Sequence, residues 1–372
     1  MKFITDRKFK FKVLGIPIYS ALLDHRIKYE NFFNTFFKVR KFTNSAETKR
    51  FKIFNYTFFE QTETNDFIYS KSEFHKKYTN KLSALKKYLN TQIDSKYTKI
   101  FILKSNLGEA YIFLKYIINN LTENEDKILI ACTKKSHVSI ANMLLPNVET
   151  KLLSNTLPEI EYNTFKIGNQ QYYIAFPMKF YINTESAINN NNAVYLDEIY
   201  KYFNISAKHS TENTLHISKA ATQKIDNYLA KNNIKKFIFI VKNAKTCTTI
   251  PDKFWNELEK SLSIKVIYND ETMPLDETYY LAAKSEAIIS LRCGLSEILS
   301  ESGKPHIILY TDFINRFRFK PITKDKIING YSIKTITPAA NKIIEIEYSD
   351  NSKTKIIKSI TETLLHKKEK TK

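Results

Sequence analysis

The segment Leu291–Pro305 has the residue types and spacing of a strand-to-helix turn that binds phosphate. Apolar runs on both sides of it are typical of buried strands, and Gly303-Lys304-Pro305 ends the short helix between them. A glycine at such a turn lets the backbone approach a ligand, and the first N–H groups of the helix then face a phosphate. We expect six residues to form this phosphate site: Arg292, Cys293, Gly294, Leu295, Ser296 and Glu297.

Strands and helices alternate on both sides of a central loop-rich region, and this rhythm predicts open, mostly parallel sheets. The first cycle has expected strands at Lys99–Leu103, Lys127–Ala131 and Tyr172–Phe176, and expected helices at Ala110–Leu121 and His137–Leu145. The second has expected strands at Lys236–Val241, Ile264–Tyr268, Ala287–Leu291 and His306–Tyr310, with helices at Phe254–Leu262, Leu275–Lys284 and Leu295–Ser302.

The fold class is therefore α/β, with two Rossmann-like domains that face a cleft, over residues 93–232 and 233–372, the second ending in a terminal helix. Ligands of open α/β sheets bind beyond the carboxyl ends of the strands. Gly108 and Gly294 both lie at predicted strand-to-helix turns, so we expect both to line that cleft.

Residues 1–92 precede these cycles and are expected to form a small α+β extension. Lys10–Tyr19 predicts a hairpin or short strand, while Asn31–Phe37 and Glu73–Leu89 have a helical pattern. Residues 1–60 carry 13 basic and 5 acidic residues among many Phe and Tyr. This favours contact with an anionic membrane surface, the alternative being a solvated basic and aromatic subdomain.

The whole chain is basic, with 58 Lys and Arg against 38 Asp and Glu. Such a charge suits nucleotides, nucleic acid or an anionic membrane, although Lys is abundant throughout and part of the excess is compositional. Cys132, Cys247 and Cys293 lack the spacing of a zinc site or disulfide framework, which favours a reducing cytoplasm. The N-terminus has no signal-peptide run, so we expect a soluble or peripheral protein.

Several chemistries lack their motifs in this sequence. Neither a Gly-x-x-x-x-Gly-Lys-Ser/Thr loop nor a Gly-x-Gly-x-x-Gly fingerprint occurs. The seven histidines have no metal-ligand spacing, and the Asp-x-Asp pattern of metal-dependent sugar transferases is absent. We therefore expect no bound metal and no resident cofactor.

The tandem α/β domains and the segment 292–305 resemble the GT-B glycosyltransferases, and among them the heptosyltransferase-like enzymes of bacterial surface polysaccharide synthesis. That family has Asp-Ser-Gly-x-x-His-x-Ala-x-x-x-Gly-x-Pro after a buried strand. This chain keeps the two glycines and the proline at that spacing. Arg292, Cys293 and Glu297 stand where the family has Asp, Ser and His, so the resemblance leaves the donor sugar open.

The resemblance also implies an acceptor side in the first domain. The family has a Gly-Asp turn near the acceptor, and this chain has Gly108-Glu109 after its first strand. We expect Glu109 to act as the general base, which takes the proton of the attacking acceptor hydroxyl. Asn106 and Gly108 would border the acceptor. The alternative is that the Glu109 carboxylate only stabilises the positive end of its helix.

The loop that follows Val241 resembles the family's loop that reaches the donor phosphate, which implies that Lys242, Lys245 and Thr246 bind the donor. Arg292 would add a charged contact to the leaving diphosphate, the alternative being a salt bridge at an ordinary turn. Trp255 is expected in the core.

Taken with the resemblance, these residues predict a metal-independent, inverting glycosyltransferase that acts on a cell-surface glycan, such as capsule or lipopolysaccharide, or on a lipid-linked acceptor. The nucleotide sugar is its substrate, and nucleic acid is not an expected partner. The alternative is a non-catalytic polyanion- or nucleic-acid-binding protein, which the +20 charge and the aromatic residues favour. Against it, the basic residues are dispersed. A third hypothesis is a degenerate glycosyltransferase fold with a scaffold role.

Overall fold

The structure is a computed structural model. It describes strands between residues 7 and 70, and residues 83–369 except 154–156, 158–163, 177–183, 185–186, 189–192, 207–212, 313–327, 329 and 337–341. Contacts divide the chain into two compact units, one made mainly of the first 91 residues and one that begins at Gln92. Each unit is described by itself.

The N-terminal unit contains a seven-stranded antiparallel meander in which each strand pairs with the next. The segments alternate Phe, Tyr, Ile and Val with Lys and Arg, a composition that favours strands. Pairing of the first two strands confirms the hairpin expected at Lys10–Tyr19. The strands are β1 (Arg7–Val13), β2 (Ile16–Leu23), β3 (Ile27–Phe32), β4 (Phe36–Thr43), β5 (Ala46–Ile53), β6 (Tyr56–Thr64) and β7 (Ile68–Ser70).

The helix expected at Asn31–Phe37 is wrong, because β3 runs to Phe32 and β4 begins at Phe36. The clustered Phe residues match a helical period by chance, whereas pairing with neighbouring strands satisfies the backbone of this segment in the sheet. Of the helix expected at Glu73–Leu89, the first ten residues lie outside the described residues. Residues 83–92 are helical, and Leu85 and Leu89 are buried.

The first α/β half of the second unit contains a five-stranded sheet of order β10-β9-β8-β12-β11. Four strands are parallel, and β11 pairs antiparallel with β12 at one edge. Three of the strands match expected ones, while β10 and β11 were not predicted. The bounds are β8 (Lys99–Leu103), β9 (Ile128–Cys132), β10 (Glu149–Leu152), β11 (Thr164–Ile167) and β12 (Gln170–Ala175).

The helix expected at Ala110–Leu121 is present but irregular. It begins as α2 (Leu107–Ile112), widens into a π-helical turn, η1 (Phe113–Ile117), and ends as the 3-10 turn η2 (Ile118–Asn120). A π-helical turn inside an α-helix frequently marks a functional site. The other helices of this half are α3 (Lys135–Leu144), α5 (Tyr195–Phe203) and α6 (Lys219–Lys231), the last leading into the second half.

The second half contains an all-parallel sheet of order β14-β13-β15-β16-β17. Its strands are β13 (Phe237–Val241), β14 (Lys265–Tyr268), β15 (Ala287–Leu291), β16 (His306–Tyr310) and β17 (Ile343–Glu347). Its helices are α7 (Asp252–Ser261), α8 (Leu275–Lys284), α9 (Gly294–Leu299), η4 (Ser300–Ser302), α11 (Ile333–Ile336), η6 (Asp350–Ser352) and α12 (Lys353–Glu369). As expected, Trp255 lies in the core, on the buried face of α7.

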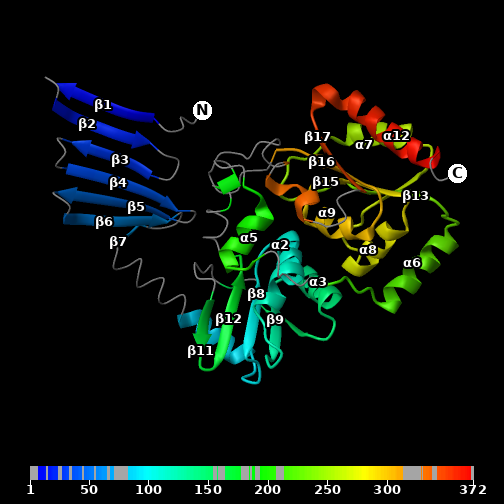
Figure 1. Ribbon diagram of the computed structural model, residues 1–372, viewed down its shortest axis with the longest axis horizontal. Coiled ribbons are helices and arrows are strands. Elements are labelled where there is room, and N and C mark those ends of the chain that lie inside the picture. Colours follow the sequence, from blue (N-terminus) through cyan, green and yellow to red (C-terminus); the bar gives the residue numbers. More distant parts are fainter. Residues whose placement is uncertain are drawn as a thin grey trace. The chain divides into compact units, whose positions relative to one another are not determined.

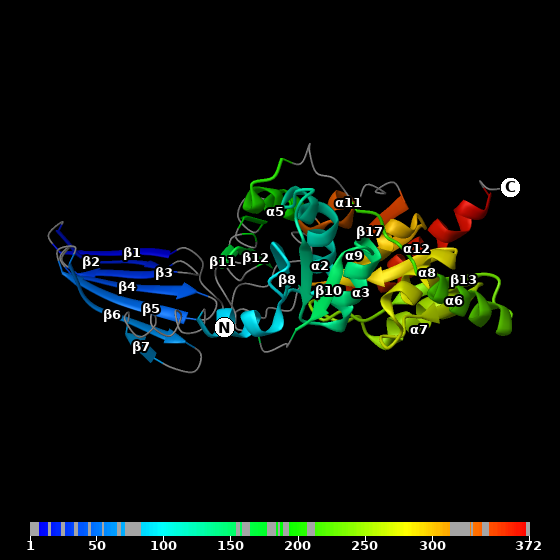
Figure 2. The same cartoon turned by 90° about the horizontal axis from the view of Figure 1, so that it is seen from below.

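The two α/β halves pack directly on one another. Helices α2 and α3 of the first half lie against α9 and α8 of the second, as Figures 1 and 2 show. A single hydrophobic core runs from Phe101 in the first sheet to Ile308 in the second. Among the described residues, no helix is both long and apolar enough to cross a bilayer.

Candidate functional site

The second sheet reverses its winding direction between β13 and β15. The chain passes from β13 to β14 on one side and then returns to add β15, β16 and β17 on the other. Open α/β sheets bind ligands at such a switch point, outside the carboxyl ends of the strands. The two loops that leave this point are residues 242–249 and the turn at Arg292–Gly294, and they contain most of the predicted donor residues.

One hydrogen bond joins the two loops, and another joins the first loop to the chain just after β16. The buried Cys247 thiol donates to the Arg292 carbonyl at 3.0 Å. Burial raises the pKa of Cys247 to about 12, so the thiol keeps its proton. The Thr248 amide donates to the Asp312 carbonyl at 2.8 Å, which anchors the loop to the end of β16 as well. The backbone at the switch point is therefore held in place before a ligand binds.

The first turn of α9 is capped by its own residues. Ser296 Oγ accepts from the Cys293 amide at 2.9 Å and donates to the Cys293 carbonyl at 2.6 Å. The Ser296 amide in turn faces the Cys293 sulfur and completes a capping box. The side chains of Cys293 and Ser296 are therefore occupied by hydrogen bonds within this turn, and their binding of a donor stays a prediction.

Gly108 and Gly294 lie at a backbone contact between the halves, rather than across an open cleft. A Cβ on Gly294 would come within 2.5 Å of the Gly108 amide nitrogen. A Cβ on Gly108 would come within 2.8 Å of the Gly294 Cα and would overlap the Glu297 carboxylate. Because α2 begins beyond β8 and α9 begins beyond β15, the carboxyl ends of the two central strands converge here.

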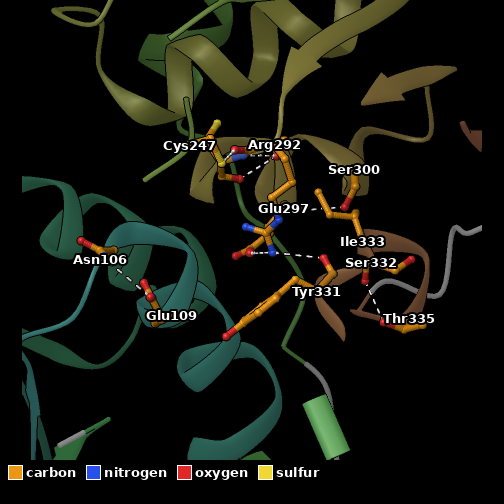
Figure 3. Close-up of polar contacts among 12 residues, drawn as sticks. Asn106, Glu109, Cys247, Arg292, Glu297, Ser300, Tyr331, Ser332, Ile333 and Thr335 are labelled. Carbon is orange, nitrogen blue, oxygen red and sulfur yellow. Dashed lines mark hydrogen bonds and ion pairs between the residues drawn. The ribbon is translucent and has the colours of Figure 1, made fainter. Parts of the chain in front are cut away.

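Arg292 and Glu297 form a buried ion pair at this contact, shown in Figure 3. The guanidinium Nη2 lies 2.5 Å from Glu297 Oε1, and the two side chains are 8% and 4% exposed. Burial lowers the pKa of Arg292, but Glu297, Tyr310 and Cys247 together outweigh it, and the pKa is raised overall. The structure therefore places Arg292 in the salt bridge that was the alternative to phosphate binding.

Two polar atoms of this pair lack a hydrogen-bond partner among the described residues, namely Arg292 Nε and Glu297 Oε2. The same guanidinium donates from Nη2 to the Tyr331 carbonyl at 3.3 Å, and its centre lies 6.0 Å from the Tyr331 ring centroid. Buried polar atoms normally have hydrogen-bond partners. A bound ligand or an added proton could supply the partner that these two atoms lack.

Glu109 lies in the first turn of α2 and is half-buried. Asn106, which is exposed, donates from Nδ2 to Glu109 Oε1 at 3.3 Å and orients the carboxylate (Figure 3). The negative charge of Glu109 also acts on Glu297. The first half thus brings Asn106, Gly108 and Glu109 to the same contact as the α9 turn.

The lysines of the donor loop lie farther from the ion pair. Lys242 Nζ forms an ion pair with Asp252 Oδ1 at 2.9 Å, at the start of α7. Lys245 is exposed, while Thr246 and Leu295 are half-buried. All four belong to the carboxyl edge of the sheet, but the structure does not bring the Lys242 ammonium to the α9 turn.

A second set of polar contacts between the halves was not predicted. Lys115 Nζ, 4% exposed, lies 2.5 Å from Glu301 Oε2, and the Tyr111 hydroxyl donates to Glu301 Oε1 at 2.8 Å. The Tyr116 hydroxyl donates to the Ile336 carbonyl at 2.6 Å. One signal was available, because Lys115 is the lone charge in the apolar run 110–118. Cys247 and Tyr331 carried no comparable signal.

The described residues contain no cluster of three or more His, Cys, Asp or Glu side chains that could hold a metal ion.

No family model and no curated protein sequence matches the chain. Several solved structures are similar to it. A glycosyl transferase family 9 protein from Veillonella parvula has a TM-score of 0.46 at 10% identity, over 74% of this chain and 99% of its own. Escherichia coli heptosyltransferase WaaC with ADP has a TM-score of 0.40 at 11% identity, over 72% and 99%. ADP-heptose LPS heptosyltransferase II of Escherichia coli has a TM-score of 0.38 at 11% identity, over 73% of this chain and 99% of its own. The solved structures to which this chain is similar therefore include glycosyltransferases.

Proposed function

We propose that this protein is a glycosyltransferase that moves a sugar from a nucleotide-sugar donor to a cell-surface glycan or a lipid-linked acceptor. The donor binds at the switch point of the second sheet, and the acceptor binds beside Asn106 and Glu109 of the first half. Transfer proceeds with inversion and without a metal ion.

One observation carries this proposal, namely the convergence of the two strand-to-helix turns at Gly108 and Gly294. It brings a carboxylate of one α/β half next to the switch point of the other. A two-substrate reaction needs its acceptor-activating group and its donor site within reach of each other. The ordered backbone at Cys247 and Arg292 supports the donor site.

The reaction that follows is a single displacement. The acceptor oxygen attacks the anomeric carbon, its proton passes to the Glu109 carboxylate, and the bond between the anomeric carbon and the diphosphate oxygen breaks. The electron pair of that bond stays on the diphosphate. Its growing charge is stabilised by the positive charges of Arg292 and Lys245, which lie on the two loops at the carboxyl edge.

A melting screen with UDP, GDP, ADP, CMP and dTDP tests the donor site. We expect one nucleotide to raise the melting temperature at low concentration, because a ligand that binds only the folded state stabilises it. Lys245→Ala should weaken that shift. Lys265→Ala removes the same charge at the amino end of β14, on the opposite edge of the sheet, and should leave the shift intact.

The same screen tests the alternative function. Stabilisation by heparin or oligonucleotides alone would support a non-catalytic polyanion-binding protein and would contradict the transferase. Absence of transfer despite tight nucleotide binding would support the scaffold hypothesis.

We also propose that the protein works at the inner face of the cell membrane, where its N-terminal sheet contacts anionic lipids. The register of the meander supports this, because one row of cross-strand positions is mostly aromatic, namely Phe11, Tyr19, Phe32, Phe36, Ile53 and Tyr56. A parallel row is mostly basic, namely Arg7, Leu23, Lys28, Arg40 and Lys49. Each basic residue near an anionic bilayer contributes about 1 kcal/mol.

Vesicle co-sedimentation tests this contact. The protein should sediment with vesicles that contain phosphatidylglycerol and not with pure phosphatidylcholine. The double variant Lys28→Glu, Arg40→Glu should lose most of this binding, and Lys253→Glu, Lys265→Glu, with the same change of charge in the other unit, should keep it. Equal binding to both vesicles would contradict the proposal.

A further inference from the structure

Glu297 is a carboxylate sealed into the contact between the two α/β halves. The residue is 3% exposed. Only Oε1 has a partner among the described residues, the Arg292 guanidinium at 2.5 Å, whereas Oε2 accepts no hydrogen bond. Oε2 lies against Gly108, so close that a Cβ on Gly108 would overlap it. Half of this buried carboxylate is therefore unsatisfied.

Titratable groups lie on each element that packs against α9. From α2 come Glu109 and the phenol Tyr111, and the Tyr111 pKa is raised well above its usual value, first by burial. From η4 comes Glu301, which is paired with Lys115.

The remaining neighbours add one cation. From α8 comes Tyr279, whose pKa burial raises to about 12. The turn that follows β15 supplies Arg292 and Cys293, and burial raises the pKa of the Cys293 thiol. Arg292 is thus the cation paired with Glu297, while Glu109 acts on Glu297 as a like charge.

This environment sets the protonation of Glu297. Burial raises its pKa, the Arg292 guanidinium lowers it, and Glu109 raises it, which leaves the pKa at about 7. A small change in the local charge will therefore shift the balance between the two protonation states at neutral pH.

We propose that Glu297 takes up a proton when the diphosphate of the nucleotide sugar binds at the switch point. This rests on the proposed function, since it needs the diphosphate near Arg292. A second anion beside that guanidinium competes with the carboxylate for the same positive charge and adds like-charge repulsion. The proton goes to Glu297 Oε2, which then becomes a donor, and the guanidinium turns toward the phosphate. Glu297 therefore controls access of the donor to Arg292 and is a positioning residue.

The direction of the pH dependence follows from linkage. Binding raises the pKa of Glu297, so the complex holds more protons than the free protein between about pH 7 and the higher pKa of the complex. Affinity for the nucleotide sugar should then fall by about three- to tenfold between pH 7 and pH 8.5 and should level off below pH 7.

Isothermal titration calorimetry measures this proton directly. The probes are UDP-glucose, GDP-mannose and ADP-glucose, whose bridging diphosphates do not titrate near neutral pH. Titration at pH 7.5 uses phosphate, HEPES and Tris, which differ in ionisation enthalpy. The apparent binding enthalpy should change with the ionisation enthalpy of the buffer, with a slope that corresponds to uptake of about half a proton. Glu297→Gln should bind with the same enthalpy in all three buffers. Glu286→Gln removes an exposed carboxylate at the amino end of β15 and should retain the uptake.

The outcomes separate the two proposals. Binding with equal enthalpies in all buffers, or unchanged uptake in Glu297→Gln, would overturn the role of Glu297 and leave the donor site standing. Absence of binding heat from all three probes, together with no melting shift from any of the five nucleotides, would overturn the donor site and the proton linkage with it. If Glu297→Gln does not fold, the affinity of the parent protein at pH 7 and pH 8.5 decides, and a constant affinity contradicts the proposal.

Discussion

Gly108 and Gly294 face each other backbone to backbone, and neither position has room for a side chain. Each glycine lies in the first turn of a helix that follows a central strand, so their contact fixes how closely the two sheets approach. The distance between the acceptor side at Glu109 and the donor side at the α9 turn therefore depends on having glycine at both positions.

Gly108→Ala and Gly294→Ala should therefore destabilise the protein by about 1–3 kcal/mol each, the usual cost of overpacking. In a helix free of this contact, Gly to Ala would instead stabilise by up to about 1 kcal/mol. Urea unfolding measures the change in unfolding free energy, and a gain in stability for either variant would show that the two glycines are not in tight contact.

The ion pair of Lys115 with Glu301 should hold the two halves together. Loss of one partner leaves a buried charge without its counter-charge, so Glu301→Gln or Lys115→Met should each cost about 3–5 kcal/mol of unfolding free energy. The double variant should cost clearly less than the sum, since no charge remains uncompensated. Strict additivity in this double-mutant cycle would show that the pair does not couple the halves.

Stability should depend on pH through Glu297. Its pKa rises from the ordinary 4.5 to about 7 in the folded protein, so the folded state binds more protons than the unfolded state between these values. Stability therefore falls as pH rises from about 4.5 to 7, by up to about 3 kcal/mol. The profile of Glu297→Gln should be flatter in this window. Parallel profiles for parent and variant would mean that Glu297 ionises normally.

Glu109→Gln should lower the rate of sugar transfer by about 10²- to 10⁴-fold, because the amide cannot accept the acceptor proton. Nucleotide-sugar binding should persist, since Glu109 lies on the acceptor side. Glu286→Gln provides the matched control with full activity. Near-normal transfer by a folded Glu109→Gln would remove this residue from the mechanism.

The sequence predicted the second sheet well, and for a physical reason. Strands β15 and β16 are mostly apolar and fully buried, and Gly294 and Gly303 delimit the helix between them, so the apolar pattern and the backbone requirements agree. Strand β11 was missed because only one of its four residues is buried, which leaves no apolar run. The helix predicted at Asn31–Phe37 was wrong because the spacing of its Phe residues fits both a helix and a strand.

The sequence predicted which residues lie at the site, but it did not predict which of them contact one another. The glycines and Glu109 follow from strand-to-helix turns, which are local. That Arg292 pairs with Glu297, or that Gly108 meets Gly294, depends on how the two halves pack, and no local pattern records this. Lys115 shows the intermediate case, since a charge in an apolar run signals a buried partner without naming it.

The central claim is that this protein transfers sugar from a nucleotide donor at the contact of Gly108 with Gly294. It is tested most directly by the nucleoside diphosphate that the purified full chain releases from a panel of nucleotide sugars, with a bacterial surface-glycan extract as acceptor. We predict release from one donor, increased by the acceptor and strongly reduced in Glu109→Gln. Release from every donor at the enzyme-free rate, with or without the extract, would contradict the claim.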